Sequence, residues 1–212
     1  MTEVKIDMWK SGPPSSKGQR QQYPSRFWTN FKKQYNIENK KILHMFSGTM
    51  DWGDTTDIRK ETNPTFVAPY NNLPIKNNTY DYVIADPPYN KGFALEWKTE
   101  LPKPKWILME ASRITKIGGI IAILHIIVIP AYKVANVERI GLHGILCGPN
   151  NAIRVLNVFR KVYKITDFIF PCGRNVTMWN SCKDCPDYPC KDTTLKMKDV
   201  INNAKSKRNT SL

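Results

Sequence analysis

The longest apolar run of the chain, Ile120 to Ile129, constrains its fold more than any other feature, and only His125 interrupts it. The run is much shorter than the roughly 20 residues of a membrane-spanning helix, so no membrane contact is expected. Its composition is typical of a strand buried on both faces, and such strands belong to parallel sheets covered by helices on either side. His125 is therefore expected to be a core histidine and neither a ligand nor a base.

Strand-like and helix-like segments alternate upstream of this run. Four short segments predict strands, at residues 42–46, 55–58, 65–68 and 80–85. The connectors after the first two are short, so one helix of an ordinary doubly wound fold is expected to be reduced or absent. Before them, Pro24 opens a helical pattern. One face of that helix is aromatic and is expected to pack into the core: Phe27, Trp28, Phe31 and Tyr35.

The second half of the chain predicts two helices and a hairpin. The first helix runs from Pro104 to about Ile117, with Gly118-Gly119 as its stop. Four residues are expected on its inner face: Trp106, Ile107, Ala111 and Ile114. The second helix is expected at 130–137. The segments 140–147 and 153–162 are typical of an antiparallel hairpin, with the turn at 148–151.

This order of elements predicts an α/β fold built on one sheet. The sheet should be mostly parallel, with an antiparallel hairpin at its end and one connecting helix reduced. A length of 212 residues allows one such domain, which is expected at residues 23–170. It would lie between a basic N-terminal arm (1–22) and a Cys-rich, basic C-terminal extension (171–212).

The chain carries a net charge of +14, and residues 1–41 hold nine basic and only three acidic side chains. Many basic proteins bind no nucleic acid, but such an arm favours a polyanionic partner because phosphate neutralisation drives sequence-independent binding. Residues 1–22 are expected to be extended or mobile until a ligand orders them. No secretory signal follows Met1, so a cytoplasmic location with reduced thiols is expected.

Four of the five cysteines lie near the C-terminus, namely Cys172, Cys182, Cys185 and Cys190. A Cys-x-x-Cys pair followed by a third thiol is typical spacing for zinc, and Cys172 would complete a tetrahedral structural site. Plain reduced thiols are an equally good interpretation of these four residues. Cys147 lies in a predicted strand and is expected to be a core residue.

The tetrad Asp86-Pro87-Pro88-Tyr89 follows the strand at 80–85 and carries the strongest chemical signal. Because proline ends a central strand, the tetrad lies where open α/β sheets bind ligands, outside the carboxyl ends of the strands. The Asp86 carboxylate and the Pro87 carbonyl can each accept a hydrogen bond from an amine. Two rigid acceptors favour a pyramidal nitrogen with a free lone pair. Tyr89 offers a flat face for a base taken out of its stack.

From about Tyr23 to Lys161, the sequence resembles the DPPY-type amino-methyltransferases, which include the DNA N6-adenine and N4-cytosine enzymes and their RNA-modifying relatives. Residues 42–48 resemble the family's first cofactor motif, and residues 72–89 resemble the block that ends in its catalytic motif. Residues 108–119 resemble the helix and Gly-Gly turn that follow. The resemblance implies a Rossmann-like methyltransferase sheet that binds S-adenosylmethionine. It also implies a set of catalytic residues: Asp86, Pro87, Pro88 and Tyr89.

The same resemblance implies a set of cofactor-binding residues. Phe46, Ser47 and Gly48 would border the methionine part of S-adenosylmethionine, with glycine where the backbone comes close to the ligand. Asp57 would bind the ribose hydroxyls, as an acid at that strand end commonly does. Asn71 or Asn72 would lie near the adenine of the cofactor. Asp86 would also contact the cofactor. The segment 17–23 would lie over the methionine end.

Three positions depart from the family pattern. Its Phe-x-Gly-x-Gly motif is reduced to Phe46-Ser47-Gly48, His44 stands where the first strand usually carries an acid, and Pro69 stands where an acid usually follows the third strand. His44 has a simpler interpretation as a core histidine.

Three functions are compatible with these sequence features. The first is methylation of adenine N6 in DNA, because Asp86 at the first motif position favours adenine within the family. The second is methylation of an RNA base, at adenine N6 or guanine N2, which suits a small basic enzyme without a recognition domain equally well. The third is a nucleic-acid-binding subunit with weak catalysis that supports an active protein partner, which the reduced cofactor motif favours. Methylation of a protein glutamine is disfavoured, because that group carries Asn where Asp86 stands.

Overall fold

The computed structural model describes residues 3–11, 23–97, 99–147 and 152–163. Within them the strands are β1 (Lys5–Ser11), β2 (Ile42–Met45), β3 (Asp54–Asp57), β4 (Phe66–Val67), β5 (Tyr80–Ala85), β6 (Thr115–His125), β7 (Val137–Cys147) and β8 (Ala152–Lys161). The helices are α1 (Phe27–Gln34), α2 (Lys91–Glu96) and α3 (Pro104–Ile114), with short 3-10 helices η1 (Lys60–Thr62) and η2 (Lys133–Ala135).

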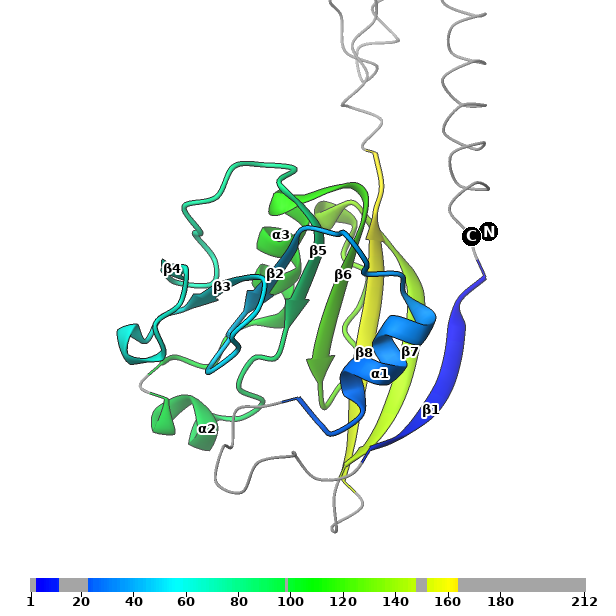
Figure 1. Ribbon diagram of the computed structural model, residues 1–212, viewed down its shortest axis with the longest axis horizontal. Helices are drawn as coiled ribbons and strands as arrows, with labels where there is room; N and C mark the ends of the chain where they lie inside the picture. Colours follow the sequence, from blue (N-terminus) through cyan, green and yellow to red (C-terminus); the bar gives the residue numbers. More distant parts are fainter. Residues whose placement is uncertain (1–2, 12–22, 98, 148–151, 164–212) are drawn as a thin grey trace, which may run out of the picture. The chain divides into compact units, whose positions relative to one another are not determined.

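The described strands form one sheet in the order β1-β7-β8-β6-β5-β2-β3-β4 (Figure 1). Neighbours are parallel except at β8, which runs antiparallel to both β6 and β7. The five strands from β2 to β6 follow the spatial order 3-2-1-4-5 that is typical of doubly wound Rossmann sheets. The predicted fold class is confirmed: a mostly parallel, Rossmann-like α/β sheet with an antiparallel terminal hairpin.

The strand order reverses between β2 and β5, which pair in parallel with Met45 opposite Ala85. The next residue of each strand end, Phe46 and Asp86, therefore leaves the sheet at the same edge. This reversal is the topological switch point at which open α/β sheets bind ligands. Residues 46–79, all of which the structure describes, contain the 3-10 turn η1 and no α-helix. The expectation of a missing connecting helix is confirmed.

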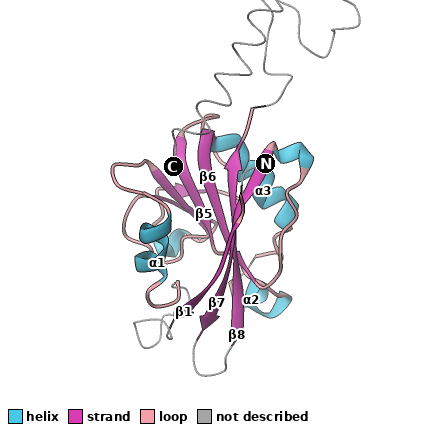
Figure 2. Cartoon of the chain, turned by 90° about the vertical axis from the view of Figure 1, so that its right-hand side faces the viewer, coloured by secondary structure: helices cyan, strands magenta, loops and turns pink. Residues whose placement is uncertain are grey.

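Two apolar cores cover the two faces of the sheet. Figure 2 shows α1 on one face and α3 on the other. On the α3 face, Ile107, Ala111 and Ile114 are fully buried against β5 and β6 residues, as expected. On the α1 face, Phe27 and Phe31 are fully buried and stack on each other with their ring centroids 5.7 Å apart. Burial on both faces explains why the central strands β2 and β5 are mostly apolar.

The N-terminal segment differs from the expectation, because β1 is part of the sheet. It pairs in parallel with β7, with Asp7 opposite His143. The His143 imidazole is fully buried. Its Nε2 is hydrogen-bonded to the Tyr35 hydroxyl at 2.6 Å, and its Nδ1 contacts the Asp7 carboxylate. The Trp9 ring stacks on the same imidazole at 4.7 Å. A partly buried polar network around His143 therefore fixes an edge strand that its polar composition did not reveal.

The end of α3 also differs from the expectation. The helix ends at Ile114 instead of about Ile117, and β6 begins at once. Gly118 and Gly119 lie inside β6, where the register with β5 shifts between Tyr80 and Tyr82, so they form a bulge and not a helix stop. Gly118 has a φ of 80°, which glycine adopts without strain.

Three further expectations are corrected or limited. Trp106 is 44% exposed and does not belong to the inner face of α3. The helix expected at 130–137 is reduced to η2, because β7 already begins at Val137. The aromatic helix begins at Phe27 and not at Pro24, whose carbonyl accepts from the Phe27 amide. In the described part of the chain, no helix combines the length and apolarity needed to cross a membrane.

Candidate functional site

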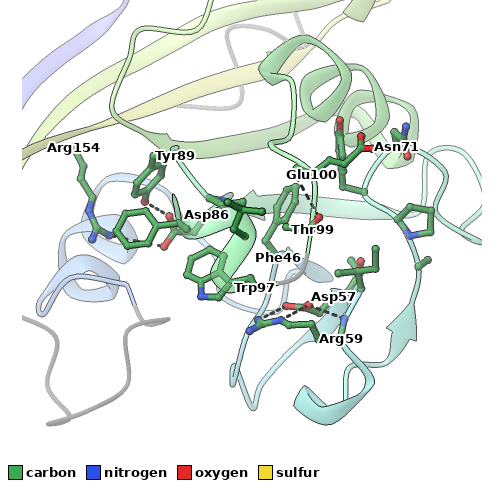
Figure 3. Close-up of a pocket in the computed structure, with 18 residues that line it drawn as sticks. Phe46, Asp57, Arg59, Asn71, Asp86, Tyr89, Trp97, Thr99, Glu100 and Arg154 are labelled. Atoms are coloured by element: carbon green, nitrogen blue, oxygen red, sulfur yellow. Dashed lines mark hydrogen bonds and ion pairs between the residues drawn. The ribbon is translucent and has the colours of Figure 1, made fainter. Parts of the chain in front are cut away.

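A cavity of about 640 Å³ opens at the switch point, next to the ends of β2, β3 and β5 (Figure 3). Its size lies within the range of pockets that enclose small organic ligands. Six residues expected from the sequence line it: Phe46, Asp57, Asn71, Asp86, Pro88 and Tyr89. Four others do not, namely Ser47, Gly48, Asn72 and Pro87. The cavity therefore joins three residues of the motif expected to be catalytic to three others expected at the cofactor, namely Phe46, Asp57 and Asn71.

The tetrad forms the end of β5, as expected. Pro87 cannot donate a ladder hydrogen bond, so the strand stops at Ala85 and the chain turns along the cavity wall. Asn90 then caps α2, where its side chain accepts from the Phe93 amide at 2.9 Å. Pro87 and Pro88 are buried, which holds the turn rigidly between strand and helix.

The Tyr89 side chain is held from three directions. Its hydroxyl donates to Asp86 Oδ1, and the Arg154 guanidinium lies over its ring, 5.2 Å from the centroid. The His125 ring meets it edge to face at 5.4 Å. His125 is itself buried and accepts from the Ile126 amide, which confirms the expected core role. The aromatic ring is thus fixed before any ligand binds.

Burial dominates the electrostatics of Asp86. It raises the pKa of this carboxyl to about 6, although the Arg154 charge and the Tyr89 hydrogen bond both act to lower it. The pKa of Tyr89 is raised well above its ordinary value by burial and by the Asp86 charge, so its hydroxyl stays a donor. A carboxyl with a raised pKa in a cavity is typical of functional sites.

The other end of the cavity is shaped by a strained turn after β2. Phe46 has a φ of 57°, which is rare for a bulky residue and is the kind of outlier that clusters at functional sites. Its ring packs against that of Tyr70 at 5.5 Å. Gly48 also has a positive φ of 54°, and its amide donates to Asp57 Oδ2 at 3.1 Å. Gly48 therefore positions the acid instead of lining the cavity.

The Asp57 carboxylate is fully engaged within the protein. Oδ1 accepts from the amide and Nε of Arg59, and Oδ2 accepts from the Arg59 guanidinium and from Gly48, all at 3.0 to 3.1 Å. A carboxylate offers about four acceptor positions, so this set uses them all. The Arg59 guanidinium also lies 5.6 Å from the Trp97 ring. Any diol that binds Asp57 has to compete with Arg59.

His44 occupies the strand position where an acid was expected from the resemblance. It is fully buried among aromatic rings, with Trp52 at 4.5 Å and Trp28 at 5.4 Å. Burial lowers its pKa to about 4, so the imidazole is neutral. Neither ring nitrogen has a hydrogen-bond partner among the described residues. His44 is a core residue, as expected, and it does not line the cavity.

Several lining residues were not foreseen from the sequence: Arg59, Tyr70, Phe93, Trp97, Glu100 and Arg154. The aromatic spacing of Phe93 and Trp97 was a usable signal, since residues four apart meet on a helix face. Their rings stack at 5.9 Å at the cavity wall. Arg154 comes from β8 and offered no local signal.

The expected metal site lies outside the described residues. Cys172, Cys182, Cys185 and Cys190 all fall in that part of the chain. Among the residues that the structure does describe, no group of three or more His, Cys, Asp or Glu could hold a metal ion. Cys147 lies in β7, as expected, but it is only half-buried and packs against the α1-face core instead of belonging to it.

No protein-family model matches the sequence, and no curated protein matches it. Solved structures do match. An S-adenosylmethionine-dependent methyltransferase from Methanosarcina mazei is 11% identical, with 62% of this chain and 97% of that chain covered and a TM-score of 0.45. One from Aquifex aeolicus is 13% identical, with 63% and 89% covered and a TM-score of 0.45. The [4+2]-cyclase SpnF is 10% identical, with 73% and 88% covered and a TM-score of 0.49.

Proposed function

We propose that this protein transfers a methyl group from S-adenosylmethionine to an exocyclic amine of a nucleic-acid base, namely N6 of adenine in DNA. One observation carries the proposal. Asp86, Pro88 and Tyr89 of the tetrad line the same switch-point cavity as Phe46, Asp57 and Asn71. A place for an aryl amine and a place for a nucleoside cofactor thus share one cavity.

The geometry of the tetrad suits an amine acceptor. Asp86 Oδ1 is taken by the Tyr89 hydroxyl, whereas Oδ2 has the Arg154 guanidinium at 4.0 Å and can still accept an N–H. The resemblance expects the Pro87 carbonyl to accept the second N–H, although Pro87 itself does not line the cavity. When bound, S-adenosylmethionine supplies an activated methyl group. The protein supplies position, and the fixed Tyr89 ring offers stacking for the base.

The cofactor end supports the same proposal. Phe46 and Tyr70 form an aromatic wall, and the backbone strain at Phe46 is typical of a turn shaped for a ligand. Asp57 at the end of β3 is the acid that Rossmann-like sheets use for a ribose diol. Asn71 lies on the cavity wall beyond it, where the resemblance expects the adenine. Partial loosening of Arg59 is required for the diol to reach Asp57.

The polymer is the less constrained part of the proposal. The net charge of +14 suits both DNA and RNA, because both carry phosphates along their backbones. Asp at the first position of the tetrad favours adenine by resemblance, and DNA is the substrate that we propose. RNA methylation, at adenine N6 or guanine N2, is the outcome that the same experiment would reveal instead.

The test is a labelled-methyl assay on duplex DNA, single-stranded DNA and total RNA, followed by digestion to nucleosides and mass spectrometry. We expect labelled N6-methyldeoxyadenosine, lost in Asp86→Asn. Asp81→Asn is a matched control, because Asp81 lies on the same strand, pairs with Lys116 and does not line the cavity. Label in RNA alone would replace the DNA proposal. No label in any polymer would overturn the enzymatic proposal for the isolated chain.

A second candidate is a weakly catalytic subunit that binds nucleic acid beside an active partner. The saturated Asp57 carboxylate favours it, since Arg59 holds the place of a ribose. Thermal unfolding with S-adenosylmethionine separates the two. A ligand at 100 times its Kd stabilises by about 2.7 kcal/mol, which the enzyme would show and a subunit that binds no cofactor would not.

A further inference from the structure

Arg154 reaches the reaction end of the cavity from a strand far away in the sequence. In β8, Val155 pairs with His125, the last residue of β6, so Arg154 lies just beyond the end of β6. Asp86 leaves the neighbouring strand β5 at the same edge. The topology of the sheet therefore places one cation beside the tetrad, and Figure 3 shows it next to Tyr89 and Asp86.

The guanidinium of Arg154 lies beside two side chains of the tetrad. Its Nη1 lies 4.0 Å from Asp86 Oδ2, and its guanidinium lies over the Tyr89 ring. The side chain is 28% exposed, so water screens the pair only in part. A planar guanidinium can stack on an aromatic face and attract a carboxylate at the same time.

Resting on the proposed function, we infer that Arg154 is a positioning residue for the reaction. Its guanidinium keeps the Asp86 carboxylate charged, and so able to accept the N–H of the substrate amine. It also holds the Tyr89 ring in place from one face.

The surroundings of Asp86 show why this cation matters. Four titratable groups interact with its carboxylate: Arg154 from β8, Tyr89 from its own turn, Tyr23 from the segment before α1 and Cys147 from β7. Of these, Arg154 alone is positively charged, and the other three are neutral at physiological pH. Burial raises the pKa of Asp86, and Arg154 is the foremost influence that lowers it. Without this charge, the buried carboxylate would keep only the Tyr89 hydrogen bond.

The test compares Arg154→Met with Arg154→Lys, which keeps the charge. The Asp86 carboxyl is titrated by carbon-13 NMR in the full chain, with Asp86→Asn to assign its signal. We expect the titration midpoint, about 6 in the wild type, to rise by about one pH unit in Arg154→Met and to change little in Arg154→Lys. Arg160→Met is the matched control, because Arg160 lies on the same strand and pairs with Glu138.

The pH dependence of methyl transfer supplies the second readout. We expect its acidic limb to move with the NMR midpoint in Arg154→Met, with kcat reduced more than cofactor affinity. An unchanged midpoint in Arg154→Met, with an active wild type, would overturn the inference and leave the proposed function intact. A raised midpoint with no methyl transfer by the wild type would overturn the proposed function, and the positioning role of Arg154 with it, but retain the Arg154–Asp86 pairing.

Discussion

Arg59 holds the carboxylate of Asp57, its neighbour but one, through two guanidinium nitrogens and its own backbone amide. The pair lies at the cavity wall with both side chains largely buried, at 14% and 6% exposure. Arg59 therefore orients the Asp57 carboxylate and also keeps other hydrogen-bond donors away from it. Cofactor affinity should therefore depend on how readily Arg59 yields.

We predict that Arg59→Ala binds S-adenosylmethionine about three- to tenfold more tightly than the wild type, or about 1 kcal/mol. The substitution frees acceptor positions on Asp57, while the Gly48 amide still orients the carboxylate. Calorimetric titration measures the change, with the exposed neighbour Lys60→Ala as control. Weaker binding in Arg59→Ala would mean that Arg59 itself contacts the ligand.

Asp86→Asn should stabilise the fold at neutral pH while it abolishes methyl transfer. The folded carboxyl has its pKa raised to about 6, whereas the unfolded one ionises at 3.8, so the folded state binds the extra proton between these values. The contribution of Asp86 to the free energy of unfolding is thus present at low pH, and it is lost as the pH rises through about 6. We expect a gain of about 1–2 kcal/mol at pH 8, after discounting the attraction to Arg154 that the substitution removes.

Unfolding in urea at pH 8 and at pH 5 measures this gain. The difference between Asp86→Asn and the wild type should shrink at pH 5, where the wild-type carboxyl is mostly protonated. An equal difference at both values would show that the charge of Asp86 is not its source.

Phe46→Gly should be more stable than Phe46→Ala, by about 1 kcal/mol. Both variants remove the ring that packs against Tyr70, but only glycine adopts the positive φ at this position without strain. The comparison reverses the usual order, in which alanine stabilises relative to glycine. Chemical unfolding of the two variants decides it, and a more stable alanine variant would show that the turn relaxes.

Gly119→Ala should destabilise the protein by about 1–3 kcal/mol. A Cβ at this position would lie 2.7 Å from the carbonyl oxygen of Asp81 and 2.7 Å from the Thr115 methyl carbon. Gly118→Ala is the companion variant, since its Cβ meets open space and only the backbone is strained. Thermal unfolding should rank Gly119→Ala below Gly118→Ala, and the opposite order would contradict the packing argument.

The strands β2 and β5 could be predicted because each is a mostly apolar run that ends at a glycine or proline turn. Ala85 was identified as a strand end since Pro87 cannot continue a ladder, and the structure ends β5 there. Gly118-Gly119 was misassigned because a helix stop and a strand bulge make the same demand for positive φ. The local sequence alone does not distinguish a helix stop from a strand bulge, because the bulge is defined by the pairing of β6 with β5.

Long-range pairing explains the other differences. The strand β1 alternates exposed Ile6 and Met8 with the network residues Asp7 and Trp9, and it becomes recognisable only beside β7. Arg154 likewise acquires its place through the register of β8 with β6. The candidate site was thus foreseen where one segment builds it, as at the tetrad, and missed where two distant segments meet.

The position of β8 sets the order in which a nascent chain can complete this sheet. β8 is the last described strand, yet it lies between β6 and β7, so β7 has no place in the sheet until residue 161 has left the ribosome. β1 pairs with β7 and must wait as well. Synthesis proceeds from the N-terminus, and the half from β2 to β6 can assemble early. Among the described strands, β1 is therefore synthesised first but is among the last to join the sheet.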